Sequence, residues 1–164
     1  MMRTEKVSLK ELDPIMDLIL FAELETLSMD NPEDEAWIRK KMSRLEASGA
    51  EFYAAYHKDE IIGFATIIVE DRPDGACSGY GAAELLQIGI RNEYRNHGYG
   101  SHILSHIEEE LRQRKVYSIY LHTYAEDYDV IAFYGKNSYI PRGVVPDVYG
   151  PNLEGMLYLS KTLK

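Results

Sequence analysis

The sequence predicts an α/β (α+β) fold with one mixed, mostly antiparallel central sheet flanked by helices. Apolar residues follow a helical period in four segments and a strand-like pattern in seven. These segments follow the order β-α-α-β-β-β-α-β-α-β-β, which suits one mixed sheet. The chain has 164 residues, of which 45% are hydrophobic and 27% charged, enough for one domain with a buried core. We therefore expect a single domain over residues 1–164.

The first elements are a short edge strand at residues 3–7 and an amphipathic helix. Ser8 followed by Glu11 has the spacing of a capping box, which predicts the start of a helix. Apolar residues continue the helical pattern as far as Leu27. Pro14 lies early in this segment, so the true start of the helix is expected to shift.

A second helix and a hairpin follow. Pro32 stands at a first helical position after Asn31, with acidic residues in the next turn, and this predicts a helix that ends near Gly49. The pattern then changes to strands at residues 51–57 and 61–69, joined by a tight turn. Together these two strands predict an antiparallel hairpin.

The second half of the chain alternates strands and helices. The expected segments are a loop at 71–82, a strand at 83–90, a helix at 98–115, a strand at 117–123, a helix at 127–138 and short strands near 140 and at 153–159. The strand–helix–strand unit from 83 to 123 predicts a right-handed crossover, so the fourth and fifth strands should be parallel. On its helix, Glu108 is spaced to pair with Arg112, and the run of Glu108, Glu109 and Glu110 is expected on a solvated face.

Composition and charge exclude several classes of protein. The net charge of −9 argues against nucleic-acid binding and suits a cationic partner. The single cysteine, Cys77, rules out an intrachain disulfide and a cysteine-rich zinc site. His102 and His106 have the spacing of a metal pair but no evident third ligand, so we expect no metal. Neither a membrane span nor a signal peptide is evident, and the expected location is the cytoplasm.

The most informative segment is a glycine-containing turn between a strand and a helix, at residues 88–101. Gly98 and Gly100 allow a sharp turn and close approach of a ligand. The amides at the start of the helix then point outward, where the helix dipole also favours an anion. Arg95 and the Ser101 hydroxyl can add to such a site. The pattern predicts a phosphate or pyrophosphate cradle; the alternative is a glycine-rich helix start without a ligand.

Two better-known phosphate motifs do not fit this turn. A dinucleotide fingerprint needs a third glycine, where this sequence has Ile103. A P-loop needs lysine after the last glycine, where this sequence has Ser101.

Two motifs then indicate a family. The segment from Arg95 to Gly100 resembles the Arg/Gln-x-x-Gly-x-Gly/Ala signature of the GNAT superfamily of acetyl-CoA-dependent N-acetyltransferases. The segment 132–139 resembles the Phe/Leu-Tyr-x-Lys-x-Gly-Phe segment of the same family, with Ser138 and Tyr139 in place of its Gly-Phe. The resemblance implies a GNAT-like sheet whose fourth and fifth strands are parallel and splayed. It also implies acetyl-CoA as co-substrate.

The resemblance also implies how coenzyme A is bound. Main-chain amides of residues 96–101 would hold the pyrophosphate, and the strand end at 88–90 would pair with the pantetheine arm. Gly89 is the candidate bulge residue of this strand. Asp127 stands where asparagine is common in the family. The expected cofactor-binding residues are Ile88, Gly89, Ile90, Arg95, Asn96, His97, Gly98, Tyr99, Gly100, Ser101 and Asp127.

Two residues are candidates for the chemistry of acetyl transfer. Tyr134 stands where the family commonly has a general-acid tyrosine, which would donate a proton to the departing thiolate; alternatively, it only packs its helix. Glu84 is the candidate general base, because it is the only carboxylate inside an apolar strand and because the histone acetyltransferase branch has a glutamate there. Alternatively, Glu84 reaches solvent at the strand end.

The leading functional hypothesis is acetyl transfer to the primary amine of a small molecule. One alternative is a protein or peptide acceptor, through a lysine or an N-terminus. Another is a coenzyme A-binding sensor without turnover. The acceptor side would include the loops at 71–82 and 141–155, where Asp147 and Tyr149 suit a cation. Dimers are frequent in the family that the chain resembles, so a homodimer is one expected state.

Overall fold

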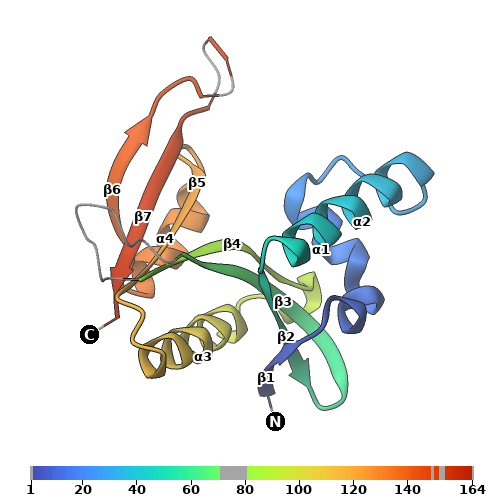
Figure 1. Cartoon of the computed structure of the whole chain (residues 1–164). Helices are drawn as coiled ribbons and strands as arrows, with labels where there is room; N and C mark the ends of the chain where they lie inside the picture. Colours follow the sequence, from blue (N-terminus) through green and yellow to red (C-terminus); the bar gives the residue numbers. More distant parts are fainter. Residues whose placement is uncertain (1, 71–80, 149, 152–153, 164) are drawn as a thin grey trace. The chain divides into compact units, whose positions relative to one another are not determined.

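A computed structural model describes residues 2–70, 81–148, 150–151 and 154–163. Its elements follow the predicted order (Figure 1). They are β1 (Met2–Val7), the 3-10 helix η1 (Leu9–Ile15), α1 (Met16–Glu23), α2 (Pro32–Ala47), β2 (Glu51–His57), β3 (Glu60–Glu70), β4 (Ala82–Ile90), the 3-10 turn η2 (Asn92–Tyr94), α3 (Tyr99–Gln113), β5 (Ser118–Tyr124), α4 (Tyr128–Lys136), β6 (Ile140–Val145) and β7 (Met156–Thr162). Most of the predicted loop at 71–82, including Cys77, lies outside the described residues.

The described strands form a seven-stranded mixed sheet in the order β1-β2-β3-β4-β5-β7-β6. Pairing is antiparallel between β1 and β2, β2 and β3, β5 and β7, and β6 and β7. The pair β4 and β5 is parallel, with Ala82–Glu84 opposite Ser118–Tyr120. Among the described residues of these two strands, this register ends at Glu84 and Tyr120, although β4 continues to Ile90. The predicted fold class and parallel pair are confirmed.

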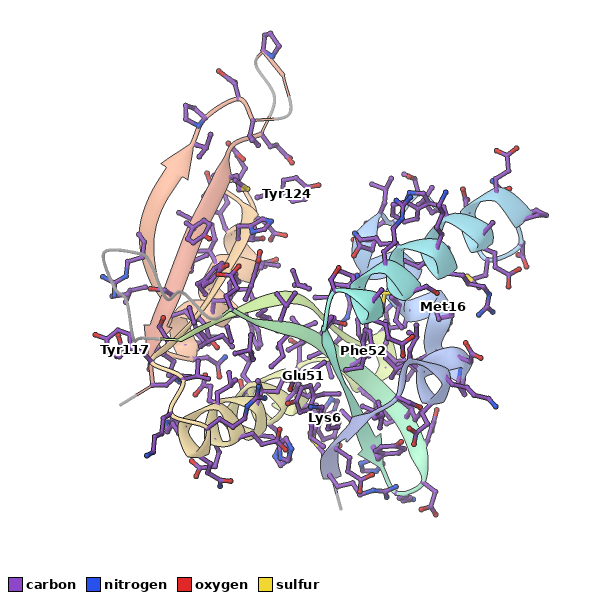
Figure 2. The ribbon with its side chains drawn as sticks, viewed as in Figure 1. Lys6, Met16, Glu51, Phe52, Tyr117 and Tyr124 are labelled. Atoms are coloured by element: carbon purple, nitrogen blue, oxygen red, sulfur yellow. The ribbon has the colours of Figure 1, made fainter. Side chains whose placement is uncertain are left out.

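Contacts divide the chain into two units, and the first contains residues 1–69 and 85–107. Its core is formed by buried side chains of η1, α1, α2, β2 and β3, among them Met16 and Phe52 (Figure 2). Between the first two strands, Lys6 of β1 forms an ion pair with Glu51 of β2 at 3.0 Å. The apolar stripes seen in the sequence therefore supply this core.

The start of the first helix differs in detail from the prediction. The amide of Ser8 donates to the Glu11 carboxylate at 2.8 Å, as expected of a capping box. The helix that follows is η1, with Pro14 inside it, and α1 begins only at Met16. Proline has no amide hydrogen for an α-helical ladder, which explains the late start. The α-helix ends at Glu23, so the expectation that it reaches Leu27 was wrong.

The second unit contains residues 70–84 and 108–164. Strands β5 and β7 lie side by side, and β6 pairs with β7 at the end of the sheet order. Its buried side chains include Ile119, Leu121, Leu159 and Tyr139.

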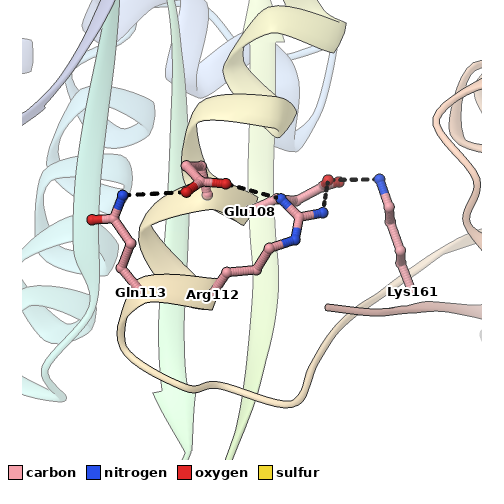
Figure 3. A network of polar contacts seen from close by, with 5 residues as sticks. Glu108, Arg112, Gln113 and Lys161 are labelled. Atoms are coloured by element: carbon pink, nitrogen blue, oxygen red, sulfur yellow. Dashed lines mark hydrogen bonds and ion pairs between the residues drawn. The ribbon is translucent and has the colours of Figure 1, made fainter. Parts of the chain in front are cut away.

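The run of glutamates on α3 is not a uniformly solvated face. Glu109 is exposed, but Glu108 is only 3% exposed and pairs with Lys161 at 2.6 Å and with Arg112 at 3.4 Å (Figure 3). The expectation was therefore wrong for Glu108. Its partner Lys161 comes from β7, a contact that spacing along α3 cannot reveal.

The end of α4 offers a test of backbone strain. Ser138 has φ +68°, and its amide donates to the carbonyl of Gly135 at 3.0 Å. This left-handed conformation is the usual place of glycine after a helix, because a Cβ there is unfavourable. We expect Ser138→Gly to raise the free energy of unfolding by about 0.5–1 kcal/mol, measured by urea denaturation. Ser138→Ala is the control and should bring no gain; equal stability of the two variants would contradict the argument.

Candidate active site

The turn that the sequence predicts as a phosphate cradle lies at the start of α3. Gly98 has φ +81°, and its carbonyl accepts the amide of His102 at 3.0 Å. Gly98 therefore precedes the first helical residue, and the amides of Tyr99, Gly100 and Ser101 belong to the first turn, where amides lack acceptors within the helix. A Cβ at Gly98 would meet no protein atom within 4 Å, so the protein leaves the space beside this residue unfilled.

The residues before Gly98 hold the turn in place. Arg95 is exposed, donates through Nε to the carbonyl of Ile90 at 3.1 Å and lies 5.9 Å from the ring of Phe21. Asn96 has φ +62°, and His97 Nδ1 lies 2.7 Å from the carbonyl oxygen of Arg95. Arg95 thus belongs to the loop that leads into the first turn of α3, and a guanidinium is a suitable partner for an anion.

Aromatic side chains connect this turn to the neighbouring strands. Tyr99 lies 3.1 Å, through its hydroxyl, from His57 Nδ1, and its ring stacks on His97 with centroids 6.0 Å apart. Tyr94 donates to the Glu60 carboxylate at 2.9 Å. These contacts join the turn to β2 and β3 within the first unit, which keeps its amides in a fixed direction.

The end of β4 is packed closely against β3. A Cβ on Gly89 would lie 2.7 Å from the ring of Phe64, and one on Gly63 would lie 2.6 Å from the Gly89 carbonyl. Glycine is required at both positions because neither leaves room for a side chain. This close approach explains Gly89; its role as a bulge stays a prediction. Ile88 and Ile90 are partly exposed, and their contact with coenzyme A stays a prediction.

Glu84 lies in a polar cluster of the second unit. Its carboxylate is 3.3 Å from His122 Nδ1 and accepts the Tyr120 hydroxyl at 3.3 Å. The side chain of Glu84 is 18% exposed and that of His122 is 43% exposed, so the pair is open to solvent. Tyr120 also donates to Glu70 at 2.8 Å. Burial, followed by the hydrogen bond to Glu70, raises the pKa of Tyr120, which therefore stays a donor.

His122 and Tyr120 were not singled out from the sequence. They alternate on β5 beside the start of β4, so the register of the parallel pair is what brings them to Glu84. The ring of His122 also stacks near Tyr158 of β7, at 6.2 Å. An alternating polar pair on the strand next to Glu84 is the signal that could have identified them.

Tyr134 is held firmly in α4. Its side chain is 6% exposed and makes edge-to-face contacts with Phe133 and Tyr139, at 5.1 Å and 5.5 Å between centroids. Burial raises the pKa of Tyr134, so the phenol is fully protonated at neutral pH. A proton donor must carry its proton, and Tyr134 meets this requirement.

A model of the acetyltransferase (GNAT) family matches residues 13–139. The chain belongs to the GNAT acetyltransferase family. It is therefore an acetyl-CoA-dependent acyltransferase, with acetyl-CoA as co-substrate. The matched residues include Arg95–Ser101, Glu84 and Tyr134, whose roles stay predictions.

Solved structures of GNAT-like enzymes share this fold. An acetyltransferase from Bacillus subtilis in complex with CoA has a TM-score of 0.73 at 16% identity, with 100% of each chain covered. Ribosomal-protein-alanine N-acetyltransferase from Brucella melitensis has a TM-score of 0.72 at 18% identity, covering 98% of this chain and 99% of that one. Naa50 from Arabidopsis thaliana, in complex with the bisubstrate analogue CoA-Ac-MVNAL, has a TM-score of 0.71 at 21% identity, covering 98% and 97%.

Asp127 has a defined structural task in this GNAT chain. Its side chain accepts the amide of Val130 at 3.1 Å and so caps the start of α4. Contact with coenzyme A stays a prediction for this residue.

Other expectations concern metals and membranes. Within the described residues, no group of three or more His, Cys, Asp and Glu side chains could hold a metal ion. His106 instead makes an edge contact with Tyr53, at 6.2 Å. None of the described helices is long and apolar enough to cross a membrane. Tyr149, expected on the acceptor side, lies outside the described residues.

Proposed function

We propose that this enzyme transfers the acetyl group of acetyl-CoA directly to the primary amine of a small cationic molecule, through a ternary complex. The observation that carries the proposal is the open turn at Gly98, followed by the first-turn amides of α3 and flanked by Arg95. Such a turn suits the pyrophosphate of coenzyme A, since backbone amides and a guanidinium bind anions. A protein with a net charge of −9 needs such local donors to bind an anionic cofactor.

Glu84 acts as the general base in this proposal. A primary amine with a pKa of about 10.4 is mostly protonated at neutral pH and cannot attack until it loses a proton. The Glu84 carboxylate can accept that proton, directly or through water, and His122 at 3.3 Å can share or pass it on. The neutral nitrogen then attacks the thioester carbonyl carbon, the carbon–sulfur bond breaks, and the thiolate takes a proton from Tyr134. The second proton of the attacking nitrogen leaves to water, and Tyr134 regains its proton from water.

The acceptor is proposed to be cationic because of an acidic cavity in the second unit. The cavity has a volume of about 430 Å³ and is lined by Tyr124, Glu126, Asp127, Tyr128, Asp129 and Glu154. Four carboxylates and two aromatic rings favour an ammonium group over a neutral or anionic one.

A peptide N-terminus is the second candidate acceptor. Two of the similar structures are named for an alanine N-acetyltransferase and for a complex with a peptide bisubstrate analogue, which favours this class. Thiol release should therefore be measured over a panel of diamines, amino sugars, lysine peptides and free N-terminal peptides. Faster turnover of peptides would select the second candidate. Acetyl-CoA binding without thiol release on any amine would indicate a sensor instead.

Tyr134→Phe tests the proposed general acid. The phenol donates to the coenzyme A thiolate as the carbon–sulfur bond breaks; a thiol pKa near 8.5 makes sulfur a fair leaving group even without help. We therefore expect kcat to fall about ten- to hundredfold, with the KM for acetyl-CoA within twofold of the wild type. Steady-state kinetics on the best acceptor measures both. Tyr117→Phe, the same change at an exposed tyrosine of the second unit, is the control, and an unchanged kcat in Tyr134→Phe would remove the acid assignment.

A further inference from the structure

One face of the sheet in the second unit leads from Glu84 to the acidic cavity. Strand β5 pairs residue by residue with β7 from Ser118 to Tyr124, without a shift of register. Its side chains therefore alternate, and Tyr120, His122 and Tyr124 lie on the same face. Glu84 contacts Tyr120 and His122, and Tyr124 lines the acidic cavity. This face thus joins the proposed base to the cavity within one unit.

The two ends of this face are four strand residues apart. Glu84 lies opposite Tyr120 in the parallel register, and Tyr124 comes four residues later on β5. A strand rises about 3.3 Å per residue, so the separation along β5 is roughly 13 Å. An extended chain advances about 1.2 Å per bond, so a molecule that reaches from Glu84 to the cavity needs about ten bonds between its ends.

Aromatic rings line the face between these ends. Tyr158 of β7 lies opposite His122, and its ring centroid is 6.2 Å from that of His122 and 5.3 Å from that of Tyr120. Tyr158 is 37% exposed and Tyr124 is 41% exposed. The residue opposite Tyr158 on β6 is Gly143, which has no side chain to cover the ring. An alkyl chain can pack on such rings, and an ammonium group gains cation–π attraction there.

Charge differs between the two ends of the face. Arg142 of β6 donates through Nε to the Ser160 hydroxyl at 2.9 Å, and Ser160 lies opposite Tyr120 on β7. The Tyr120 end therefore has a cation beside it, whereas the Tyr124 end leads to the four carboxylates of the acidic cavity. A second positive charge on a molecule bound at Glu84 is attracted toward the cavity and repelled from Arg142.

We infer that the acceptor is a linear primary amine with a second ammonium group about ten bonds from the reacting nitrogen. The reacting nitrogen lies at Glu84, the chain packs along the exposed ring of Tyr158, and the second ammonium enters the acidic cavity. The inference rests on the proposed role of Glu84 as the general base. The covalent step is the acetyl transfer proposed above, and the second ammonium keeps its proton and its charge.

Two series of straight-chain amines test the inference. Diamines with amino groups at both ends carry the second ammonium, and n-alkylamines of the same lengths lack it. Thiol release gives kcat/KM for each amine. We expect the diamine-to-monoamine ratio of kcat/KM to be about one at four carbons and to reach about tenfold near nine carbons, which place ten bonds between the nitrogens. The ratio should fall in about 1 M NaCl, because salt screens the attraction by the carboxylates.

The double variant Asp129→Asn, Glu154→Gln tests where the second ammonium binds. Both residues line the cavity and are exposed, and their replacement leaves in place Asp127, which caps α4. We expect this variant to lower the nine-carbon ratio from about tenfold to less than about threefold. Glu109→Gln, which removes an exposed carboxylate from α3 in the same unit, is the matched control and should keep the ratio.

The outcomes separate this inference from the proposed function. A ratio of one at every length, a maximum at the shortest diamines, or a ratio that the double variant keeps would overturn the site for the second ammonium, while acetyl transfer to an amine stands. In Glu84→Gln both series should slow alike, because the ratio depends on the cavity and not on the base. A wild-type rate in Glu84→Gln would remove the base and this inference with it. Acetyl-CoA binding without thiol release on any amine would overturn both proposals.

Discussion

Gly98→Val is expected to weaken acetyl-CoA binding about a hundredfold or more. The turn needs φ +81° at this position, which valine strongly disfavours, and the residue directly precedes the first-turn amides of α3, so a change in its backbone redirects them. Each lost hydrogen bond to a charged phosphate costs about 1.5–3 kcal/mol, so two lost bonds account for this change. Isothermal titration calorimetry with acetyl-CoA measures it.

Gly49→Val is a matched control for this experiment. Gly49 follows α2 in the same unit, has φ +84° and, like Gly98, would place a Cβ with no protein atom within 4 Å. Both substitutions therefore introduce a similar backbone strain of about 1–2 kcal/mol, but only one lies at the cradle. We expect both variants to lose stability and only Gly98→Val to lose acetyl-CoA binding. Micromolar binding retained by Gly98→Val would contradict the proposed site.

The turn before α3 could be predicted from sequence because its determinants are local. The two glycines, Arg95 and the following apolar period lie within a few residues of one another, so a strand-to-helix turn and its exposed amides follow from short-range rules. The same holds for the helix boundaries, where Ser8 and Asn31 act as caps as expected. The exception, the late start of α1, also has a local cause in Pro14.

The partners of Glu84 could not be predicted in this way. His122 is 38 positions from Glu84 by number, and only the three-residue register of β4 with β5 brings the two strands together. Glu108 and Lys161 are 53 residues apart. The pattern of charged residues on α3 indicates a solvated face. Glu108 is nevertheless buried, and its partner Lys161 belongs to β7, which comes much later in the sequence.

The second large effect is expected of Glu84→Gln. The amide cannot accept the ammonium proton, so at pH 7 the reaction depends on the roughly one amine in a few thousand that is already neutral. We expect kcat/KM to fall about a hundred- to a thousandfold at this pH. As pH rises toward the amine pKa of about 10, the neutral fraction grows without help from the enzyme. The deficit of the variant should therefore shrink with increasing pH, which a pH–rate profile measures.

Glu70→Gln is the control for this profile. Glu70 accepts the same Tyr120 hydroxyl, at 2.8 Å against 3.3 Å for Glu84, but His122 contacts Glu84. The control removes a carboxylate of the same cluster and should leave kcat/KM within twofold. A deficit in Glu84→Gln that is the same at every pH would assign Glu84 a structural role, because only proton removal becomes unnecessary at high pH. A profile identical to the wild type would place the base elsewhere, with the exposed His122 as the next residue to replace.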